Sequence, residues 1–239
     1  MSQQFLKLNA DKTQVKIFWA KRSKLQVEKV MNFKCDDTVN ILGVTFDDSL
    51  NFEKFIAKKV QTCNFHLRNF YSIRKSLNFN TKVVLVTNMV LSTLDYCNVL
   101  LLGCTDKTIR PLHLVLNKAI RFIFNLNIRE HISPYYEKLH ILPVKKRIVF
   151  KACLLAFKVF KRFAPSYLND DFNLFSATTT INLREGVGRD GMMFKLKGLR
   201  DGKGGLFERI KNEWNSLPLH IRNSKTIEIF KRNLKTHIF

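Results

Sequence analysis

The chain has 239 residues and carries 41 Lys and Arg against 19 Asp and Glu, which gives a formal net charge of +22. Hydrophobic residues make up 46% of the sequence and include 21 Phe, a share that excludes a disordered basic tail. The longest apolar run, at 148–163, is interrupted by Lys and Arg and is too short and too charged to span a membrane. The charge indicates a polyanionic partner, and the alternative is a basic protein whose charge serves no specific partner.

The first fifty residues have the composition of short strands. Segments 14–19, 25–33 and 39–46 are rich in β-branched and aromatic side chains, and turn signals such as Asp36-Asp37 lie between them. We therefore predict a small antiparallel sheet. A sheet of this size has little stability of its own and depends on the elements that follow it.

From residue 51 onward, apolar residues recur every three or four positions, which is the helical period. Gly103 and Thr105 supply a stop and a cap between two of these periodic segments. Near the C-terminus, Trp214 and Phe230 are the expected core anchors. The pattern predicts helices at 51–77, 81–101, 109–124, 145–163, 206–217 and 224–239, with a short one opening at Ser133-Pro134.

These elements predict a mainly α protein with a small antiparallel β segment at its N-terminus. We expect the strands in residues 1–50, a helical bundle in 51–130 and a second helical region in 131–239. Seven of the nine glycines fall between residues 186 and 205. The stretch 184–205 is therefore predicted to form a flexible basic loop or a loose hairpin.

Cysteine and histidine spacing carries no metal signature. The five cysteines form no C-x-x-C pair and the six histidines are dispersed, so we predict no structural metal. The cysteines are interpreted as thiols of a reducing compartment, which leads us to expect an intracellular protein of the nucleus or cytoplasm.

Several short motifs occur in one order along the chain. They are LKLN-x-x-KT at 6–13, ILGV at 41–44, S-x-LDYCN at 92–98, LHILPV-x-x-RI at 139–148, APSYL at 164–168, WNSLP-x-x-IR at 214–222 and FK-x-x-LKTHIF at 230–239. In this order they resemble the reverse transcriptases of non-LTR (LINE-type, jockey/CR1-like) retrotransposons. The resemblance implies the end of a polymerase palm in residues 1–50, a thumb in 51–130 and a helical post-thumb region in 131–239.

The resemblance also implies what is missing. The Asp-Asp box that holds Mg²⁺ in the parent enzyme precedes the LKLN motif and does not occur here, so we expect the chain to begin within a domain and to lack the parent's N-terminal part. The pairs Asp36-Asp37, Asp47-Asp48 and Asp170-Asp171 are interpreted as turns or caps. Lys12 matches the lysine of the family's palm motif, but without a metal site we predict no cofactor and no catalytic residue.

A candidate binding surface lies on the first long helix. At about 100° per residue, Lys54, Lys58, Arg68 and Lys75 fall within an arc of about 100° opposite the apolar stripe, and Phe65 lies inside that arc. An aromatic side chain on a basic face suits contact with a nucleic-acid backbone. The alternative is a solvated helix face with one Phe packed on a neighbouring element.

We therefore expect a remnant of a retrotransposon RNA-directed DNA polymerase that keeps a template-primer binding surface and is not an enzyme as an isolated chain. Its expected partners are RNA, DNA or an RNA–DNA duplex, together with the missing part of the parent polymerase, and no membrane. The alternative is a helical adaptor, derived from the same bundle, that docks another protein.

Overall fold

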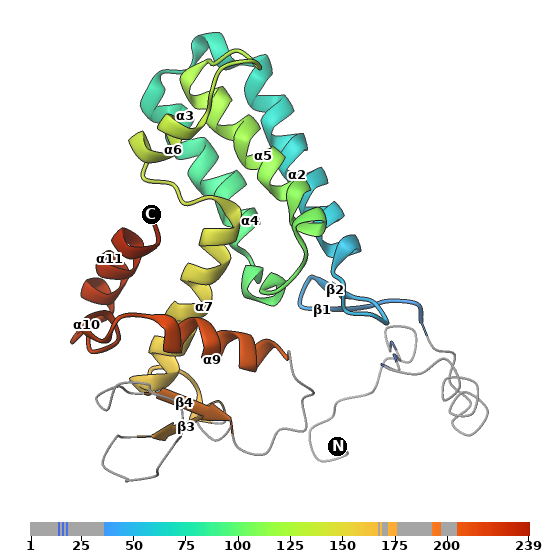
Figure 1. Ribbon diagram of the computed structural model, residues 1–239. Coiled ribbons are helices and arrows are strands. Elements are labelled where there is room, and N and C mark those ends of the chain that lie inside the picture. The colour runs from blue at the N-terminus through green and yellow to red at the C-terminus, as the bar shows by residue number, and fades with distance from the viewer. Residues whose placement is uncertain are drawn as a thin grey trace, which may run out of the picture. The chain divides into compact units, whose positions relative to one another are not determined.

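The structure is a computed structural model that describes residues 14, 16, 18, 36–166, 168, 172–175, 193–196 and 205–239 (Figure 1). The chain divides into two compact units, residues 1–59 and 60–239. The predicted fold class is confirmed, because the described part is mainly helical with a small two-stranded antiparallel sheet at residues 39–46.

In the first unit, the strand predicted at 39–46 is a hairpin. Strands β1 (Val39–Ile41) and β2 (Val44–Phe46) are antiparallel, with Ile41 opposite Val44. The turn residues Leu42 and Gly43 have φ angles of 49° and 79°, a conformation that glycine adopts without strain. The prediction of a single strand was wrong because the turn interrupts it. The strands predicted at 14–19 and 25–33 lie outside the described residues, apart from positions 14, 16 and 18.

Of the two acidic pairs of the first unit, Asp47-Asp48 lies at a turn. The Asp47 carboxylate accepts hydrogen bonds from the backbone N–H groups of Ser49 and Asn51, each at 3.1 Å. Lys16 donates to the carbonyl oxygens of Asp36 and Asp37 at 3.0 and 2.5 Å and forms an ion pair with Asp48. The turn role predicted for Asp47 is confirmed, whereas Asp170-Asp171 lies outside the described residues.

Helix α2 (Glu53–Ser72) is shorter than the predicted 51–77. It is followed by the 3₁₀ turn η3 (Arg74–Ser76), and the chain is extended at Leu77. The side chain of Asn78 then accepts a hydrogen bond from the Thr81 N–H at 2.8 Å, which caps the next helix.

The helix predicted at 81–101 is broken into four pieces. Helix α3 (Phe79–Leu85) continues into the π-helical turn η4 (Val86–Leu91), then into α4 (Ser92–Asp95) and the 3₁₀ turn η5 (Asn98–Leu101). The Thr93 hydroxyl donates to the carbonyl of Met89 at 2.7 Å, and such bonds compete with regular helix geometry. Cys97, at φ 50°, lies between α4 and η5.

The remaining helices follow the predicted pattern closely, except for the short helix at Leu219–Arg222, which lies between the helices predicted at 206–217 and 224–239. Helix α5 (Asp106–Phe124) is capped by Thr105 and ends at Asn125, which has a left-handed backbone. Gly103, at φ 86°, lies just before this cap, as predicted. The others are α6 (Ser133–Lys138), α7 (Val144–Phe160), α9 (Leu206–Ser216), α10 (Leu219–Arg222) and α11 (Ile227–Ile238).

The second unit also contains a hairpin, in which β3 (Phe172–Phe175) pairs antiparallel with β4 (Met193–Leu196). Strand β4 lies inside the segment predicted as a basic loop or a loose hairpin. In Figure 1, α3, α5 and α6 lie together, α9, α10 and α11 form a separate group, and α7 runs between the two groups. No described helix is long and apolar enough to cross a membrane.

Two side-chain clusters hold α7 in place. At its C-terminal half, Phe157 stacks on Phe230 with ring centroids 4.2 Å apart, and Trp214 packs on Phe230 at 5.8 Å. Trp214 and Phe230 are fully buried, so their predicted role as core anchors is confirmed. At its N-terminal half, Arg147 donates to both oxygens of Asp95, from Nε at 2.8 Å and from Nη2 at 2.5 Å.

The Asp95–Arg147 pair predicts a measurable loss of stability on neutralisation. Its side chains are only 20% and 18% exposed, so Asp95→Asn should lower the free energy of unfolding by about 1–3 kcal/mol. The matched control is Asp106→Asn, which removes the well-exposed ion pair with Lys145 and should cost less than about 1 kcal/mol. Denaturant unfolding followed by circular dichroism measures both variants, and equal losses would contradict the prediction.

Candidate nucleic-acid interface

The predicted basic face of α2 is exposed. Lys54, Lys58, Phe65 and Arg68 lie on one continuous helix and are all solvent-exposed, with Phe65 at 58%. Their helical spacing therefore holds as predicted. Lys54 and Lys58 belong to the first compact unit, and Phe65 and Arg68 belong to the second.

Two other predicted residues are placed differently. Lys75 is exposed, but it lies in the 3₁₀ turn η3, beyond the end of α2 at Ser72. The 100° rule therefore does not place it on the α2 face, which is a correction to the predicted arc. Lys12 lies outside the described residues.

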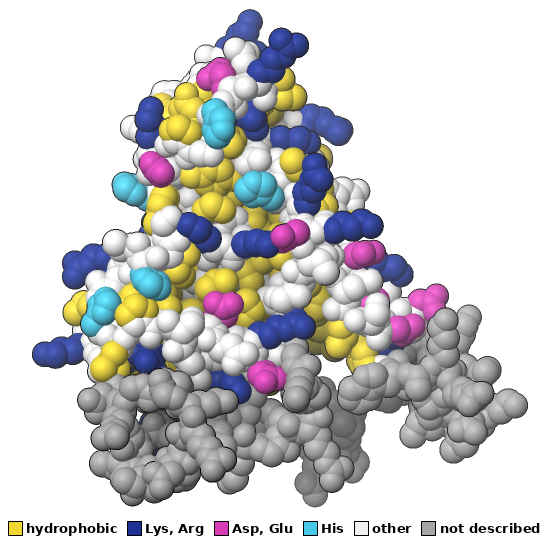
Figure 2. Space-filling model, viewed as in Figure 1, with side chains coloured by type: hydrophobic (Ala, Val, Ile, Leu, Met, Phe, Trp, Pro, Cys, Tyr) yellow, Lys and Arg dark blue, Asp and Glu magenta, His cyan; other side chains and the backbone are white. Residues whose placement is uncertain are grey.

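A second basic face lies on α5, and the sequence reasoning missed it. At about 100° per residue, Lys107, Arg110, Leu114 and Lys118 fall within an arc of about 80°. All four are exposed, Leu114 at 48%. Figure 2 shows Lys and Arg side chains along the side of the second unit where α5 and the C-terminal half of α2 run.

The α5 face adjoins the C-terminal half of α2. Lys118 Nζ donates to Asn64 Oδ1 at 3.4 Å, and the Tyr71 hydroxyl donates to the Lys118 carbonyl at 3.5 Å. Beneath these contacts the ring of Phe122 lies 5.2 Å from that of Tyr71. Arg68 is four residues after Asn64, so it lies on nearly the same side of α2. Arg68 and Lys118 therefore border the seam between the two helices.

Some cations of the second unit form hydrogen bonds that stabilise the fold. Lys82 is buried and donates to Asn125 Oδ1 at 2.9 Å, which ties α3 to the end of α5. Arg121 is directed to the carbonyl oxygens of the loop after α5, which it binds at 3.4, 3.2 and 3.3 Å. These two residues are structural, which separates them from Arg68, Lys107 and Arg110, for which no ion pair occurs among the described residues.

The acidic side chains of segment 60–130 are Asp95, Asp106 and Glu130. Asp95 binds Arg147 and lies 3.6 Å from Lys151, and Asp106 pairs with Lys145. The Glu130 carboxylate accepts from the Asn127 N–H at 2.7 Å. Asp95 and Asp106 therefore neutralise cations of α7, and Glu130 closes the loop in which it lies.

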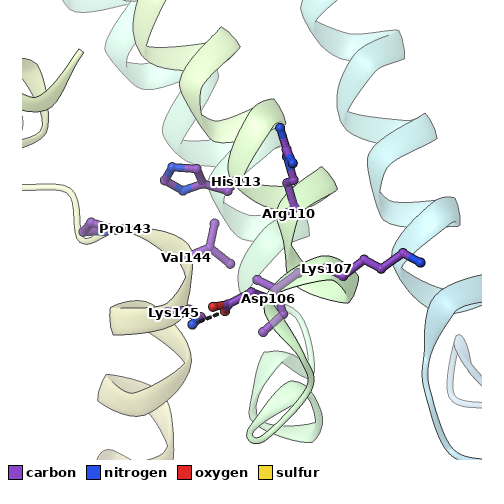
Figure 3. Close-up of a pocket in the computed structure, with 8 residues that line it drawn as sticks. Asp106, Lys107, Arg110, His113, Pro143, Val144 and Lys145 are labelled. Atoms are coloured by element: carbon purple, nitrogen blue, oxygen red, sulfur yellow. Dashed lines mark ion pairs between the residues drawn. The ribbon is translucent and has the colours of Figure 1, made fainter. Parts of the chain in front are cut away.

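A hollow of 530 Å³ lies between the first turns of α5 and α7, lined by Asp106, Lys107, Ile109, Arg110, His113, Pro143, Val144 and Lys145. Figure 3 shows Lys107 and Arg110 extending away from the Asp106–Lys145 ion pair in different directions. The cations therefore do not converge inside the hollow. We assign Lys107 and Arg110 to the outer face of α5.

His113 connects the hollow to the core. Its ring stacks on Tyr136 with centroids 6.3 Å apart, and the Tyr136 hydroxyl donates to Asn117 Oδ1 at 2.6 Å. Burial lowers the pKa of His113 and raises that of Tyr136. Both groups are therefore held in their neutral forms near pH 7, and they add no charge to the surface.

The thiols and histidines in the described part of the chain do not cluster as metal ligands. Cys63 and Cys153 are buried thiols, and Cys97 and Cys104 are partly exposed ones. Within the described ranges, no group of three or more His, Cys, Asp or Glu side chains is placed to hold a metal ion.

The signal for the α5 face was present in the sequence. The predicted third helix began at Ile109, whereas α5 begins at Asp106, so Lys107 was left out of the helical face. Extending the helix to the Thr105 cap brings Lys107, Arg110 and Lys118 onto one side. The contact with Asn64, by contrast, depends on tertiary packing and has no signal in local spacing.

Comparison of the chain with family models, with curated proteins and with solved structures gives no match.

The lowered pKa of His113 predicts an acid-sensitive stability. The unfolded chain binds the imidazole proton more readily than the folded one, so the free energy of unfolding should fall as pH drops through the ordinary value of 6.5. His113→Gln should flatten this fall between about pH 7.5 and 5.5. His131→Gln, at an exposed position, is the matched control. Unfolding at a series of pH values measures the slope, and an unchanged slope in His113→Gln would refute the assignment.

Proposed function

We propose that this chain binds nucleic acid and corresponds to the end of the palm, the thumb and the post-thumb part of a non-LTR reverse transcriptase, without polymerase chemistry of its own. The observation that carries the proposal is the exposure of Lys54, Lys58, Phe65 and Arg68 on α2. Four more exposed cations support it, namely Lys75, Lys107, Arg110 and Lys118. A chain of net charge +22 has its natural ligand in a polyanion.

Contacts between the motif segments support the proposed lineage. Asp95 of the LDYCN segment binds Arg147 of the LHILPV-x-x-RI segment. Trp214 of the WNSLP segment packs on Phe230 of the FK-x-x-LKTHIF segment at 5.8 Å. Residues that form one core or one ion pair constrain each other's identity, which gives a physical reason for these segments to occur together.

The proposal assigns no nucleotidyl transfer to this chain. Two-metal polymerase chemistry needs carboxylates from separate strands to hold two ions about 4 Å apart. The Asp-Asp pairs in the sequence, at 36–37, 47–48 and 170–171, all follow the LKLN motif, whereas the family's Asp-Asp box precedes it. Asp47, from one of the three remaining acidic pairs, is engaged in closing the turn before α2.

The first test is primer extension. The purified chain should not extend a DNA primer on an RNA or DNA template in the presence of Mg²⁺ or Mn²⁺. A catalytically complete reverse transcriptase serves as the positive control, and a mock purification sets the background. Extension above that background would show that the chain carries its own polymerase site.

The second test measures the contribution of α2 together with Lys75 of the turn η3 that follows it. Changing Lys54, Lys58, Arg68 and Lys75 to Glu keeps good helix formers and leaves the buried stripe of α2 intact. If all four contact phosphates, the slope of log affinity against log salt on a duplex should shrink by about 3–4. Binding titrations at several salt concentrations, with circular dichroism as a check on folding, measure this slope.

The matched control changes four exposed cations elsewhere, Lys158, Lys225, Lys231 and Arg232, to Glu. It alters the net charge equally and should reduce the slope much less than the α2 variant does. If the control variant loses more slope than the α2 variant, the binding surface is not on α2.

A further inference from the structure

An exposed serine lies just beyond the end of α2. Ser76 is the last residue of the 3₁₀ turn η3 and is solvent-exposed. Its backbone N–H donates to the Ile73 carbonyl at 3.0 Å, whereas its hydroxyl forms no hydrogen bond within the part of the chain that the structure describes. An enzyme that approaches from solvent therefore meets a hydroxyl group that is available for reaction.

Exposed serines inside the helices are placed differently. Ser72 of α2 and Ser216 of α9 donate their hydroxyl protons to the carbonyls three residues earlier, at 2.7 and 2.8 Å. Their hydroxyls are thus engaged by their own backbone, and a modifying enzyme would have to unwind a helix to reach them. Ser76 belongs to a turn of only three residues, a structure whose hydrogen bonds have poorer geometry than those of an α-helix.

The backbone after Ser76 is already extended. Leu77 has φ −98° and ψ 129°, and Asn78 has φ −74° and ψ 168°. A hydroxyl that is to be modified must reach into the cleft of an enzyme. A short turn that is followed by two extended residues can enter such a cleft without disrupting α2 or α3.

The residues before Ser76 carry a charge pattern that suits recognition by a protein kinase. Arg74 and Lys75 directly precede the serine, and both are exposed. Kinases select their substrates partly by charge pattern, and two cations before the serine match a cleft lined by carboxylates. Elsewhere in the sequence, Ser23 alone among Ser and Thr directly follows two basic residues, and it lies outside the described residues.

We propose that Ser76 is a phosphorylation site for a serine kinase that selects basic residues before its target, and that the phosphate weakens nucleic-acid binding at the end of α2. The site itself rests on the exposure, the backbone and the charge pattern around Ser76. Its effect on binding rests on the proposed function.

The reaction is phosphoryl transfer from ATP with Mg²⁺. The Oγ atom of Ser76 attacks the γ-phosphorus, so that an Oγ–P bond forms while the bond between that phosphorus and the bridging oxygen breaks. The hydroxyl proton passes to the catalytic-loop carboxylate of the kinase, and ADP leaves. The kinase and ATP–Mg²⁺ supply the catalytic groups, and this chain supplies the nucleophile.

The phosphate places a charge of about −1.5 to −2 at pH 7 beside two cations. Lys75 is a member of the proposed binding surface, and the Arg74 guanidinium lies 5.9 Å from the centroid of the Tyr71 ring at the end of α2. Charge-assisted hydrogen bonds from these cations to the new phosphate compete with those to an external polyanion. Phosphorylation therefore removes positive charge from the surface that the proposed function requires.

The first part of the test locates the phosphate. The purified full chain is incubated with ATP, Mg²⁺ and the catalytic subunit of a kinase that prefers basic residues before serine, and tandem mass spectrometry identifies the modified residues. Arg74→Gln with Lys75→Gln should slow phosphorylation of Ser76 by about tenfold, because the variant loses two ion pairs with the kinase. The matched control, Lys231→Gln with Arg232→Gln, removes the same charge from other exposed positions and should leave the rate unchanged.

The second part measures binding to an RNA–DNA duplex at several salt concentrations, in a Ser23→Ala background that leaves Ser76 as the acceptor with two preceding cations. The phosphorylated chain should lose up to about 1.8 from the slope of log affinity against log salt, because two phosphate contacts of about 0.9 each are lost. The same chain with Ser76→Ala, treated identically, should keep its slope. Circular dichroism verifies that each sample is folded.

The outcomes separate the site from its effect. Absence of phosphate on Ser76, or equal rates in the two charge variants, overturns the phosphorylation site. Phosphate on Ser76 with an unchanged salt slope overturns the effect on binding. If the unphosphorylated chain does not bind the duplex, the proposed function fails and the effect on binding fails with it, while the mass spectra still decide whether Ser76 is a site.

Discussion

The bidentate ion pair between Asp95 and Arg147 joins the helices around α5 to α7, and much of the second unit depends on it. Both side chains are about four-fifths buried, and Lys151 adds a second cation at 3.6 Å. Leaving either partner unpaired would be costly, because a desolvated charge needs a compensating partner. The aromatic packing of Phe157 on Phe230 then fixes the other half of α7. One helix is thus held by an ion pair at one end and by a core cluster at the other.

The same ion pair also affects how charge is distributed over the surface of the protein. In a chain with 19 acidic residues for 41 basic ones, each carboxylate that is directed inward leaves cations elsewhere without a balancing partner. Asp95 is directed inward and pairs with Arg147 of α7, whereas Asp106 pairs with Lys145 of α7 at an exposed position. Lys82 and Arg121 close the ends of helices. Among the described residues, Arg68 of α2 and Lys107 and Arg110 of α5 form no ion pair and keep their positive charge at the surface. The same small set of carboxylates therefore stabilises the helices and leaves the proposed binding surface positively charged.

The sequence predicted the elements whose signals are local. The Thr105 cap, the positive φ at Gly103 and the apolar period fixed α5 to within a few residues, and the buried Trp214 and Phe230 were foreseen. Periodicity failed at the π-helical turn η4, where the backbone leaves the 3.6-residue repeat, and at the Leu42-Gly43 turn, which lacks the usual Asn-Gly signal. The face of α2 was predictable because it lies on one helix. The joint face with α5 was not, because its seam is made by residues 54 positions apart.

The most direct measurement is lysine footprinting of the full chain on an RNA–DNA duplex. Brief acetylation with and without the duplex, followed by mass spectrometry, reports which ammonium groups become inaccessible on binding. The account predicts protection of Lys107 and Lys118 together with Lys54 and Lys58, while Lys225 and Lys231 keep their reactivity. Protection confined to Lys225 and Lys231, with Lys107 and Lys118 still fully acetylated, would contradict it.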